Sequence, residues 1–275
     1  MLIKNILMCY PKNYNVNHYK MNYFMKQSRN VNKHYAYLQW DTLYTTLCNL
    51  GINITLIKPA NLLTDMVFCS NSSLIYNNKA IISNYTAYPR KYEEQYYKNF
   101  YKDNNYDIYP MYTNFEGSGD AIFSHNKTQL WIAHSKRTSY YAYYEVKDYL
   151  DDININYNRL NIIDNRFYQL DTCFCPIDEN IAILYEEAFD KNSLDIIYNI
   201  YDKNKCITIN EQDALNLVCN SIIIENNLGN ICIIGHKFSP ILKQLFIEEG
   251  YDFIENNMSE YILSGGSTKS IILNL

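Results

Sequence analysis

The last residues of the chain combine glycines, small hydroxyl residues and an apolar strand. Residues 263–274 read Leu-Ser-Gly-Gly-Ser-Thr-Lys-Ser-Ile-Ile-Leu-Asn. Glycines open backbone geometry that is closed to other residues and let a backbone approach a ligand closely. The β-branched run behind them is typical of a buried strand. Such a turn would hold Ser270 at the mouth of a cavity. A serine hydroxyl attacks a substrate only when a base removes its proton, so the function depends on what surrounds Ser270.

Composition excludes several classes of protein. The chain has 275 residues, of which 48% are hydrophobic, and we expect one domain spanning residues 1–275. A net charge of −5 argues against a nucleic-acid partner, which requires a basic stripe. The longest apolar runs, such as 231–235, are far too short for a membrane span, and residues 1–9 indicate a first strand and not a signal peptide. We therefore expect a cytoplasmic protein with no membrane or nucleic-acid partner.

Cysteine usage supports the same view. Eight cysteines without a secretory signal are expected to be reduced thiols. Cys173 and Cys175 form a C-x-C pair, but no second pair or histidine cluster accompanies it. Alternate positions on one strand explain the pair better than zinc does. We predict no metal and no cofactor.

A sequence pattern of an acid, a strand, a polar turn and a second strand recurs about every fifty residues. Such a period is typical of arrays and propellers. Its four complete copies open at or near Asp65, Glu116, Asp171 and Ala214. A fifth, C-terminal copy could find its partner only in the N-terminal strand.

Amphipathic helices are predicted between these strand pairs. The first is expected to begin near Asn32 and to stop at Gly51, and others cover residues 140–150, 193–201 and 241–249. Five such units, with the two chain ends sharing one, would close into a ring. The predicted fold is therefore α/β, a five-bladed propeller with pseudo-fivefold ββαβ repeats and acids lining its central cavity.

Four segments resemble one superfamily in their order and spacing. They are 65–68 (Asp-Met-Val-Phe), 115–120 (Phe-Glu-Gly-Ser-Gly-Asp), 167–176 (Phe-Tyr-Gln-Leu-Asp-Thr-Cys-Phe-Cys-Pro) and the C-terminal Gly-Gly strand. They resemble the guanidino-modifying enzymes: amidinotransferases, arginine deiminases and, most closely, dimethylarginine dimethylaminohydrolase-like proteins. The resemblance runs from Cys9 to Leu275. It implies the five-bladed pentein fold, in agreement with the repeats.

The resemblance also implies a set of catalytic positions. The family uses a cysteine nucleophile in the Gly-Gly turn, a histidine as general acid and base, and a carboxylate that orients the histidine. In this chain Ser270 stands at the cysteine position, Gln169 at the histidine position and Glu116 at the carboxylate position. An amide does not titrate, and serine without a base is a poor nucleophile. We therefore expect an inactive member of the superfamily.

The substrate-binding positions are better preserved. Asp65, Asn71 and Asp171 stand where the resembled enzymes hold a guanidinium or an α-amino group, and Arg90 and Arg137 stand where they hold a carboxylate. An arginine fork matches a carboxylate in two hydrogen bonds. Two simpler interpretations compete: in one, Arg90 only pairs with nearby glutamates at the surface, and in the other, Asp171 only begins a strand. The expected ligand is arginine or a related guanidino or amino-acid molecule; the oligomeric state is left open.

Three hypotheses follow. In the leading one, the protein binds such a ligand without turnover, and Gln169 and Ser270 satisfy each other by hydrogen bonding. In the second, an active hydrolase or amidinotransferase has rebuilt its centre around Ser270, Cys69 or Cys173, although His125, His134 and His236 lie outside the motif. In the third, the protein is an interaction scaffold whose tyrosine-rich stretches 92–106 and 140–149 contact a partner.

Overall fold

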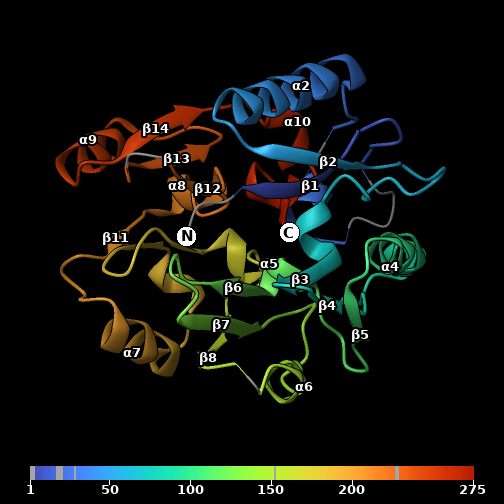
Figure 1. Cartoon of the computed structure of the whole chain (residues 1–275). Helices are drawn as coiled ribbons and strands as arrows, with labels where there is room; N and C mark the ends of the chain where they lie inside the picture. The colour runs from blue at the N-terminus through green and yellow to red at the C-terminus, as the bar shows by residue number, and fades with distance from the viewer. Residues whose placement is uncertain (1–3, 17–20, 28, 152, 227–228) are drawn as a thin grey trace.

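The computed structural model describes residues 4–16, 21–27, 29–151, 153–226 and 229–275. Five three-stranded sheets lie around a common centre, with helices on the outside (Figure 1). In order from the inner to the outer strand, the first two sheets are β3 (Ser73–Tyr76), β4 (Lys79–Ile82) and β5 (Asp107–Pro110), then β6 (Ala121–Phe123), β7 (Gln129–His134) and β8 (Asn156–Asn161). The next two are β9 (Phe174–Pro176), β10 (Ala182–Leu184) and β11 (Ile207–Thr208), then β12 (Ile222–Glu225), β13 (Ile231–Gly235) and β14 (Asp252–Glu255).

The fifth sheet joins the two chain ends. Its inner strand β15 (Leu273–Asn274) pairs antiparallel with β1 (Asn5–Cys9), and β1 pairs parallel with β2 (Asn53–Ile57). Every sheet repeats this pattern of one antiparallel and one parallel pair. The predicted five-bladed α/β propeller, closed by its termini, is confirmed.

One helix follows each middle strand and leads back to the parallel outer strand. These outer helices are α2 (Lys33–Asn49), α4 (Glu94–Asp103), α6 (Ala142–Tyr149), α7 (Lys191–Ile200) and α9 (Pro240–Glu248). The predicted limits of α2 hold: Asn32 accepts a hydrogen bond from Tyr35 N over 3.3 Å, and Gly51 adopts a φ of 79° beyond the helix end. The cores lie between sheets and helices; Trp40, Leu43 and Leu47 of α2, for example, pack onto Ile6 and Met8 of β1.

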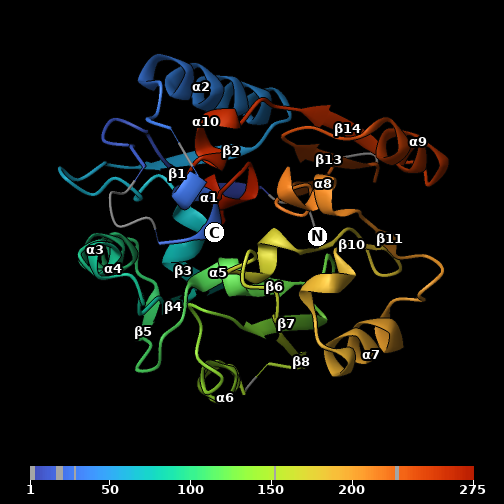
Figure 2. The ribbon, with the colours of Figure 1, turned by 180° about the vertical axis from the view of Figure 1, so that it is seen from behind.

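Short helical segments fill the remaining connections. They are α1 (Tyr23–Gln27), α3 (Tyr88–Lys91), α5 (Gly117–Asp120), α8 (Glu211–Leu215) and α10 (Ser259–Ile262), with 3-10 turns η1 (Cys69–Ser72), η2 (Leu170–Thr172), η3 (Glu186–Ala188) and η4 (Lys269–Ile271). Figure 2 shows α1 near the centre of the face opposite to that of Figure 1.

The acids do not open strands as predicted. Each inner strand is preceded by a turn or short helix, and the acids lie there. In three blades a hydroxyl donates to the carbonyl three residues earlier: Ser72 to Cys69 O (2.7 Å), Thr172 to Gln169 O (2.5 Å) and Ser221 to Val218 O (2.7 Å). Such side-chain bonds offer the backbone an alternative to the sheet ladder. The acids are therefore held in tight turns at the ends of the inner strands.

Candidate functional site

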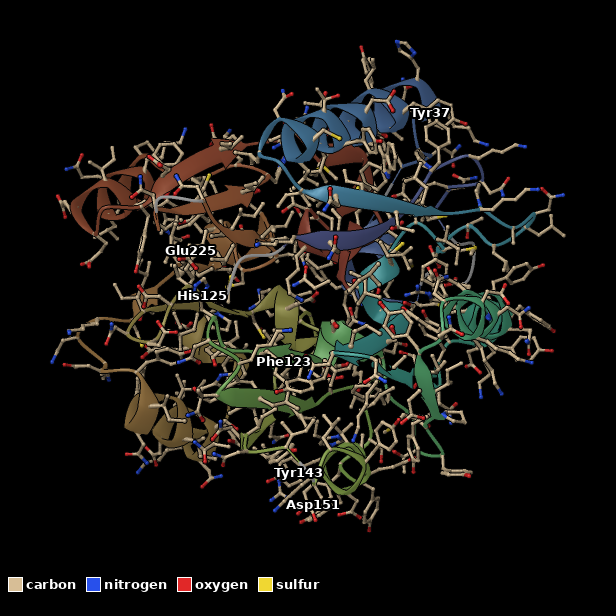
Figure 3. All side chains as sticks on the ribbon, viewed as in Figure 1. Tyr37, Phe123, His125, Tyr143, Asp151 and Glu225 are labelled. Atoms are coloured by element: carbon tan, nitrogen blue, oxygen red, sulfur yellow. The ribbon has the colours of Figure 1, made fainter. Side chains whose placement is uncertain are left out.

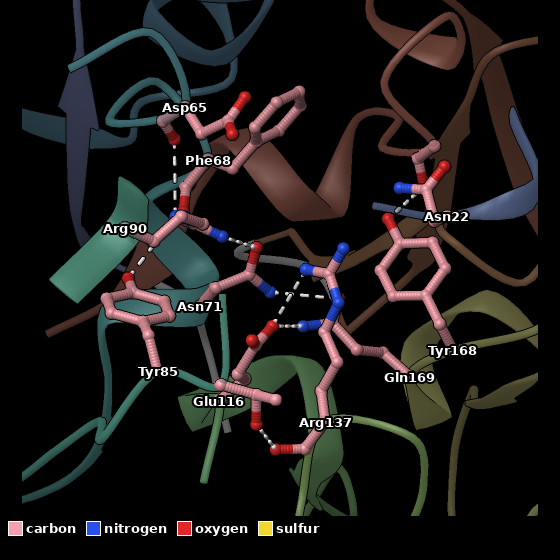
Figure 4. Close-up of polar contacts among 12 residues, drawn as sticks. Asn22, Asp65, Phe68, Asn71, Tyr85, Arg90, Glu116, Arg137, Tyr168 and Gln169 are labelled. Atoms are coloured by element: carbon pink, nitrogen blue, oxygen red, sulfur yellow. Dashed lines mark hydrogen bonds and ion pairs between the residues drawn. The ribbon is translucent and has the colours of Figure 1, made fainter. Parts of the chain in front are cut away.

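Five of the eight predicted site residues line one cavity of about 10 Å³ at the centre of the propeller. They are Asp65, Asn71, Arg90, Arg137 and Ser270, and all five are buried. Met21 and Met25 line the same cavity from the segment that carries α1. Figure 4 shows the polar contacts behind this inner cavity. The turn at Gly265 needs its glycine: φ is 88°, and a Cβ there would lie 2.8 Å from the hydroxyl of Tyr168.

Glu116 and Gln169 form a hydrogen-bonded chain with Asn71. Gln169 Nε2 donates to Glu116 Oε2 over 2.6 Å, and Asn71 Nδ2 donates to Gln169 Oε1 over 3.1 Å. Gln169 is 1% exposed, so these contacts define its orientation. Both ends of the amide are thus engaged in holding a buried polar cluster together. The chain places Gln169 beside the carboxylate that the family resemblance assigns as its orienting partner.

Arg137 completes this cluster. Its Nη1 donates to Glu116 Oε2 over 3.0 Å, and its guanidinium lies 4.3 Å from the ring centroid of Tyr168. Arg137 Nη2 and Glu116 Oε1 are buried atoms without a hydrogen-bond partner among the described residues. Buried polar atoms are nearly always paired. Arg137 lines the inner cavity and Glu116 lies directly behind it in contact with Arg137, so this pair is the place in the cluster where a polar ligand would find unpaired groups.

Arg90 is held much more completely. It donates to both carboxylate oxygens of Glu93, at distances of 2.8 to 3.2 Å, and also to Asn71 Oδ1 over 2.9 Å. Its Nη2 also reaches the Asp65 and Phe68 carbonyls and the Tyr85 hydroxyl. The simpler interpretation is right that Arg90 pairs with a glutamate but wrong that the pair lies at the surface. The side chains of Arg90 and Glu93 are 3% and 1% exposed. Burial raises the pKa of Glu93 to about 7, although Arg90 opposes the shift.

Ser270 is positioned by Asn220, a residue that belongs to none of the motifs singled out above. Asn220 Oδ1 accepts hydrogen bonds from Ser267 N (2.8 Å), Ser270 N (3.1 Å) and Ser270 Oγ (3.1 Å). The expected hydrogen bond between Gln169 and Ser270 is therefore wrong, because each has other partners. An amide oxygen can accept the hydroxyl proton only as a hydrogen bond and cannot remove it.

No described histidine lines the inner cavity. His125 contacts Glu225, His134 contacts the Thr138 carbonyl, and His236 accepts the Met258 amide proton. His34 is exposed on α2, and His18 lies outside the described residues.

The two alternative cysteine nucleophiles are also outside the cavity. Cys69 and Cys173 are both fully buried and pack into separate hydrophobic clusters. Burial raises the pKa of Cys69 to about 12 and that of Cys173 well above its usual value. Because the thiolate is the reactive form, neither thiol is suited to attack.

Asp171 lies in η2 and makes an ion pair with Lys269. Lys269 Nζ lies 3.2 Å from Asp171 Oδ2 and donates to the Ser118 carbonyl over 2.7 Å. Asp171 is fully buried; burial raises its pKa, and the ammonium of Lys269 opposes that shift. Asp171 therefore lies beside the serine turn, where Lys269 of that turn pairs with its carboxylate. Lys269 is not among the predicted site residues.

A larger cavity of about 600 Å³ adjoins the inner one. The two share Met21, Arg137 and Tyr168 in their linings. This outer vestibule is also lined by Lys26, Lys136 and Arg166. Arg166 is already paired with Asp164 and Glu211. Lys26, Lys136 and the shared Arg137 remain as the cations that suit an anionic group, such as a carboxylate, at the entrance to the inner cavity.

The described residues contain no group of three or more histidine, cysteine or acidic side chains that could hold a metal ion. Within the same ranges, none of the helices is long and apolar enough to cross a membrane.

Comparisons with known proteins agree with this architecture. ArgZ of Synechocystis sp., a bifunctional arginine dihydrolase/ornithine cyclodeaminase, is 33% identical over 273 residues, which are 98% of this chain and 37% of ArgZ. The chain thus spans little more than a third of that relative. The solved N-terminal domain of ArgZ, as a cysteine-to-serine mutant bound to substrate, has a TM-score of 0.91 at 31% identity and covers 98% of this chain and 97% of its own.

A mutant of the related protein AgrE of Nostoc sp., cysteine to alanine, was solved as a complex with L-arginine. It has a TM-score of 0.91 at 31% identity over 98% of this chain and 40% of its own. The model of the family described as N,N dimethylarginine dimethylhydrolase, eukaryotic, matches residues 9–275. The chain therefore belongs to this family of arginine-modifying penteins.

Proposed function

We propose that the protein binds arginine or a related guanidino amino acid in the inner cavity and does not hydrolyse it. The observation that carries the proposal is the contact between Gln169 and Glu116 at 2.6 Å, in which an amide occupies the place of a proton-transferring base.

The chemistry of the site explains the lack of turnover. Ser270 donates to the amide of Asn220, and no described histidine lines its cavity to serve as the base. General acid and base help is worth about 10²–10⁴ in rate, or roughly 3–5 kcal/mol of barrier. An unactivated hydroxyl adds to this barrier because it is a much weaker nucleophile than a thiolate.

The same cluster supports binding. Glu116 Oε1 is a buried acceptor suited to a guanidinium, and Arg137 Nη2 is a buried donor suited to a carboxylate. Asp65 and Asn71 line the same cavity as Arg137 and Ser270. Arg90 contributes less direct charge to a ligand, because Glu93 already balances it.

Two relatives support the separation of binding from turnover. ArgZ carrying a cysteine-to-serine change was solved bound to substrate, and AgrE carrying a cysteine-to-alanine change was solved with L-arginine. We propose that Ser270, which is part of this chain's own sequence, likewise allows a ligand to bind without being turned over.

Ligand entry requires movement, since a cavity of about 10 Å³ holds only about one water. Met21 and Met25 are the side chains to be displaced toward the outer vestibule. Methionine has three rotatable bonds and adapts readily to a new shape. A rebuilt, active centre is not favoured, because Cys69 and Cys173 are in the core.

Exposed tyrosines keep the scaffold hypothesis as a second candidate. Five lie in or beside the two tyrosine-rich stretches: Tyr92, Tyr96, Tyr140, Tyr141 and Tyr144. Robust binding to a protein partner without any amino-acid binding would favour that function.

A matched pair of variants tests the binding site. Arg137→Gln removes the cation beside Glu116 and is expected to weaken L-arginine binding at least tenfold by calorimetry. The control is Arg159→Gln, which removes an arginine that contacts Tyr140 and Tyr144 outside both cavities. Equal weakening by both variants, or by neither, would contradict the proposed site.

A further inference from the structure

A third cavity, of about 150 Å³, lies on the inner strands of the propeller and borders the serine turn at Lys269 and Ile272. One apolar residue from each blade illustrates its wall: Leu74, Ile122, Pro176, Ile223 and Ile272. We call it the strand cavity. It shares no lining residue with the inner cavity or the outer vestibule.

The lysines that line this cavity are Lys127 and Lys269, with no aspartate or glutamate among its described lining residues. Lys269 lines it and does not line the inner cavity. An ammonium has three donors, and Lys269 Nζ uses two of them on Ser118 O and Asp171 Oδ2. The side chain of Lys269 is 21% exposed, so the ammonium is reachable from the cavity.

The rim adds a second cation. Lys127 lines the cavity and lies 5.6 Å and 5.9 Å from the ring centroids of Tyr76 and Phe123. Glu225 approaches the rim, but its carboxylate contacts His125 at 2.8 Å (Figure 3). The charged side chains that line the cavity itself are thus both lysines, which suits an anion.

We propose that the strand cavity binds a small monocarboxylate with an apolar body of about six carbons, with its carboxylate on Lys269. The size follows from the volume, because a cavity of about 150 Å³ accommodates benzene. The apolar walls take the hydrocarbon out of water, and the carboxylate accepts a charge-assisted hydrogen bond from the remaining ammonium proton.

The position of Lys269 also couples the two cavities. It directly precedes Ser270 and neutralises Asp171. This second step rests on the proposed function: an anion on Lys269 weakens its hold on Asp171 and leaves that carboxylate more attractive to a guanidinium. Such coupling is reciprocal, so each ligand is expected to tighten the binding of the other.

The first experiment uses no guanidine. Benzoate and 4-methylpentanoate are titrated into the protein by calorimetry, with the uncharged benzamide as a probe of the charge requirement. Both acids are expected to bind at one site, at least tenfold more tightly than benzamide. Absence of binding by the acids, or equal binding of benzamide, would overturn the proposal.

Two variants place the site. Ile223→Trp fills the wall, and the double variant Lys269→Met/Asp171→Asn removes the ion pair without leaving a buried charge uncompensated. Each is expected to reduce benzoate binding at least tenfold, with urea unfolding used to verify that the variant is folded. Arg159→Gln, at a residue that lines none of the three cavities, is the control and is expected to bind benzoate normally. Undiminished benzoate binding by folded Ile223→Trp would overturn the proposal.

Coupling is then measured by titrating L-arginine with and without saturating benzoate. Benzoate is expected to tighten arginine binding at least threefold in the wild type and not in Ile223→Trp. If benzoate binds in the strand cavity but arginine does not bind at all, the proposed function fails while the monocarboxylate site stands. Unchanged arginine affinity with bound benzoate would overturn the coupling.

Discussion

Gln169 donates a hydrogen bond of 2.6 Å to Glu116, while Ser270 donates to Asn220 in a separate hydrogen-bonded group. The two residues that we propose to stand at the family's histidine and cysteine positions therefore belong to different networks. Each side chain has its hydrogen-bond partners within its own network. Retention of structure does not require a contact between the two residues.

Restoring both family residues is expected to create activity. In Gln169→His/Ser270→Cys, the imidazole can bond to Glu116 and serve as the base, and the thiol supplies the nucleophile. We expect arginine turnover in the double variant that exceeds either single variant by about 10²-fold or more. The measurement is release of citrulline, ornithine and ammonia by the purified proteins. A folded double variant that binds arginine but releases nothing would contradict the assigned positions.

Asn220 is expected to be a major determinant of stability. Its side chain accepts three hydrogen bonds from the serine turn, and Nδ2 donates to the Asp171 carbonyl over 3.3 Å. Asn220→Ala leaves buried donors unpaired and should lower the free energy of unfolding by about 3 kcal/mol. Urea unfolding measures the change.

The matched control for Asn220 is Asn204→Ala, at an exposed position, with an expected effect within about 0.5 kcal/mol. An effect at position 220 no larger than that at position 204 would show that the turn does not depend on this amide.

The buried pair of Arg90 and Glu93 differs in kind from a surface pair. Glu93→Gln leaves the Arg90 guanidinium buried without its counter-charge, which typically costs about 3–5 kcal/mol. The exposed pair of Lys243 and Glu255, at 2.9 Å, is the comparison. Lys243→Met is expected to cost less than about 1 kcal/mol. Chemical denaturation should show a clearly larger loss of unfolding free energy for Glu93→Gln than for Lys243→Met. Similar losses of unfolding free energy in the two variants would contradict a structural role for the buried pair.

The pH dependence of stability should report the buried Asp120. Burial raises its pKa well above the ordinary value of 3.8, against the hydrogen bond from Thr138. A carboxyl whose pKa is higher in the folded state stabilises fully below its unfolded pKa, and this stabilisation is lost as the pH rises through the folded value. The free energy of unfolding should therefore fall as the pH rises above about 4.

Asp120→Asn should flatten this profile, while Asp103→Asn, at an exposed position, should leave it unchanged. Urea unfolding across the pH range gives the slope. The pKa values of Asp171 and Glu93 are also raised, so these groups contribute to the slope in the same direction. The informative quantity is therefore the difference in slope between the wild type and Asp120→Asn. Identical slopes in these two proteins would contradict the raised pKa.

Local patterns predicted much of the fold. Short apolar runs located β4, β7, β12 and β13, and Asn32 together with Gly51 delimited α2, because these signals act within a few residues. The closing pair of β1 and β15 followed from counting unpaired strands. The turns η1 and η2 were missed because the hydroxyl bonds that form them compete with strand geometry in a way that residue type alone does not decide.

The candidate site divides in the same way. The resemblance selected Asp65, Asn71, Arg90, Arg137 and Ser270, which the structure brings together in one cavity. Their partners were not predictable. Asn220 lies fifty residues from Ser270 in a chain rich in asparagine, and nothing local distinguishes it. The pairing of Arg90 with a nearby glutamate was considered, but at the surface and not in the interior. The pairing of Lys269 with Asp171 depends on the fold, because the two residues lie far apart in the sequence.

Calorimetric titration of the wild-type protein with L-arginine, with product assayed in the same cell, tests the central claim most directly. The account predicts saturable binding with a Kd below about 1 mM, equivalent to about −4 kcal/mol or stronger, and no product above a protein-free blank. Release of citrulline, ornithine or ammonia by the wild type would contradict it, because Gln169 and Ser270 would then support the turnover that their chemistry and contacts argue against.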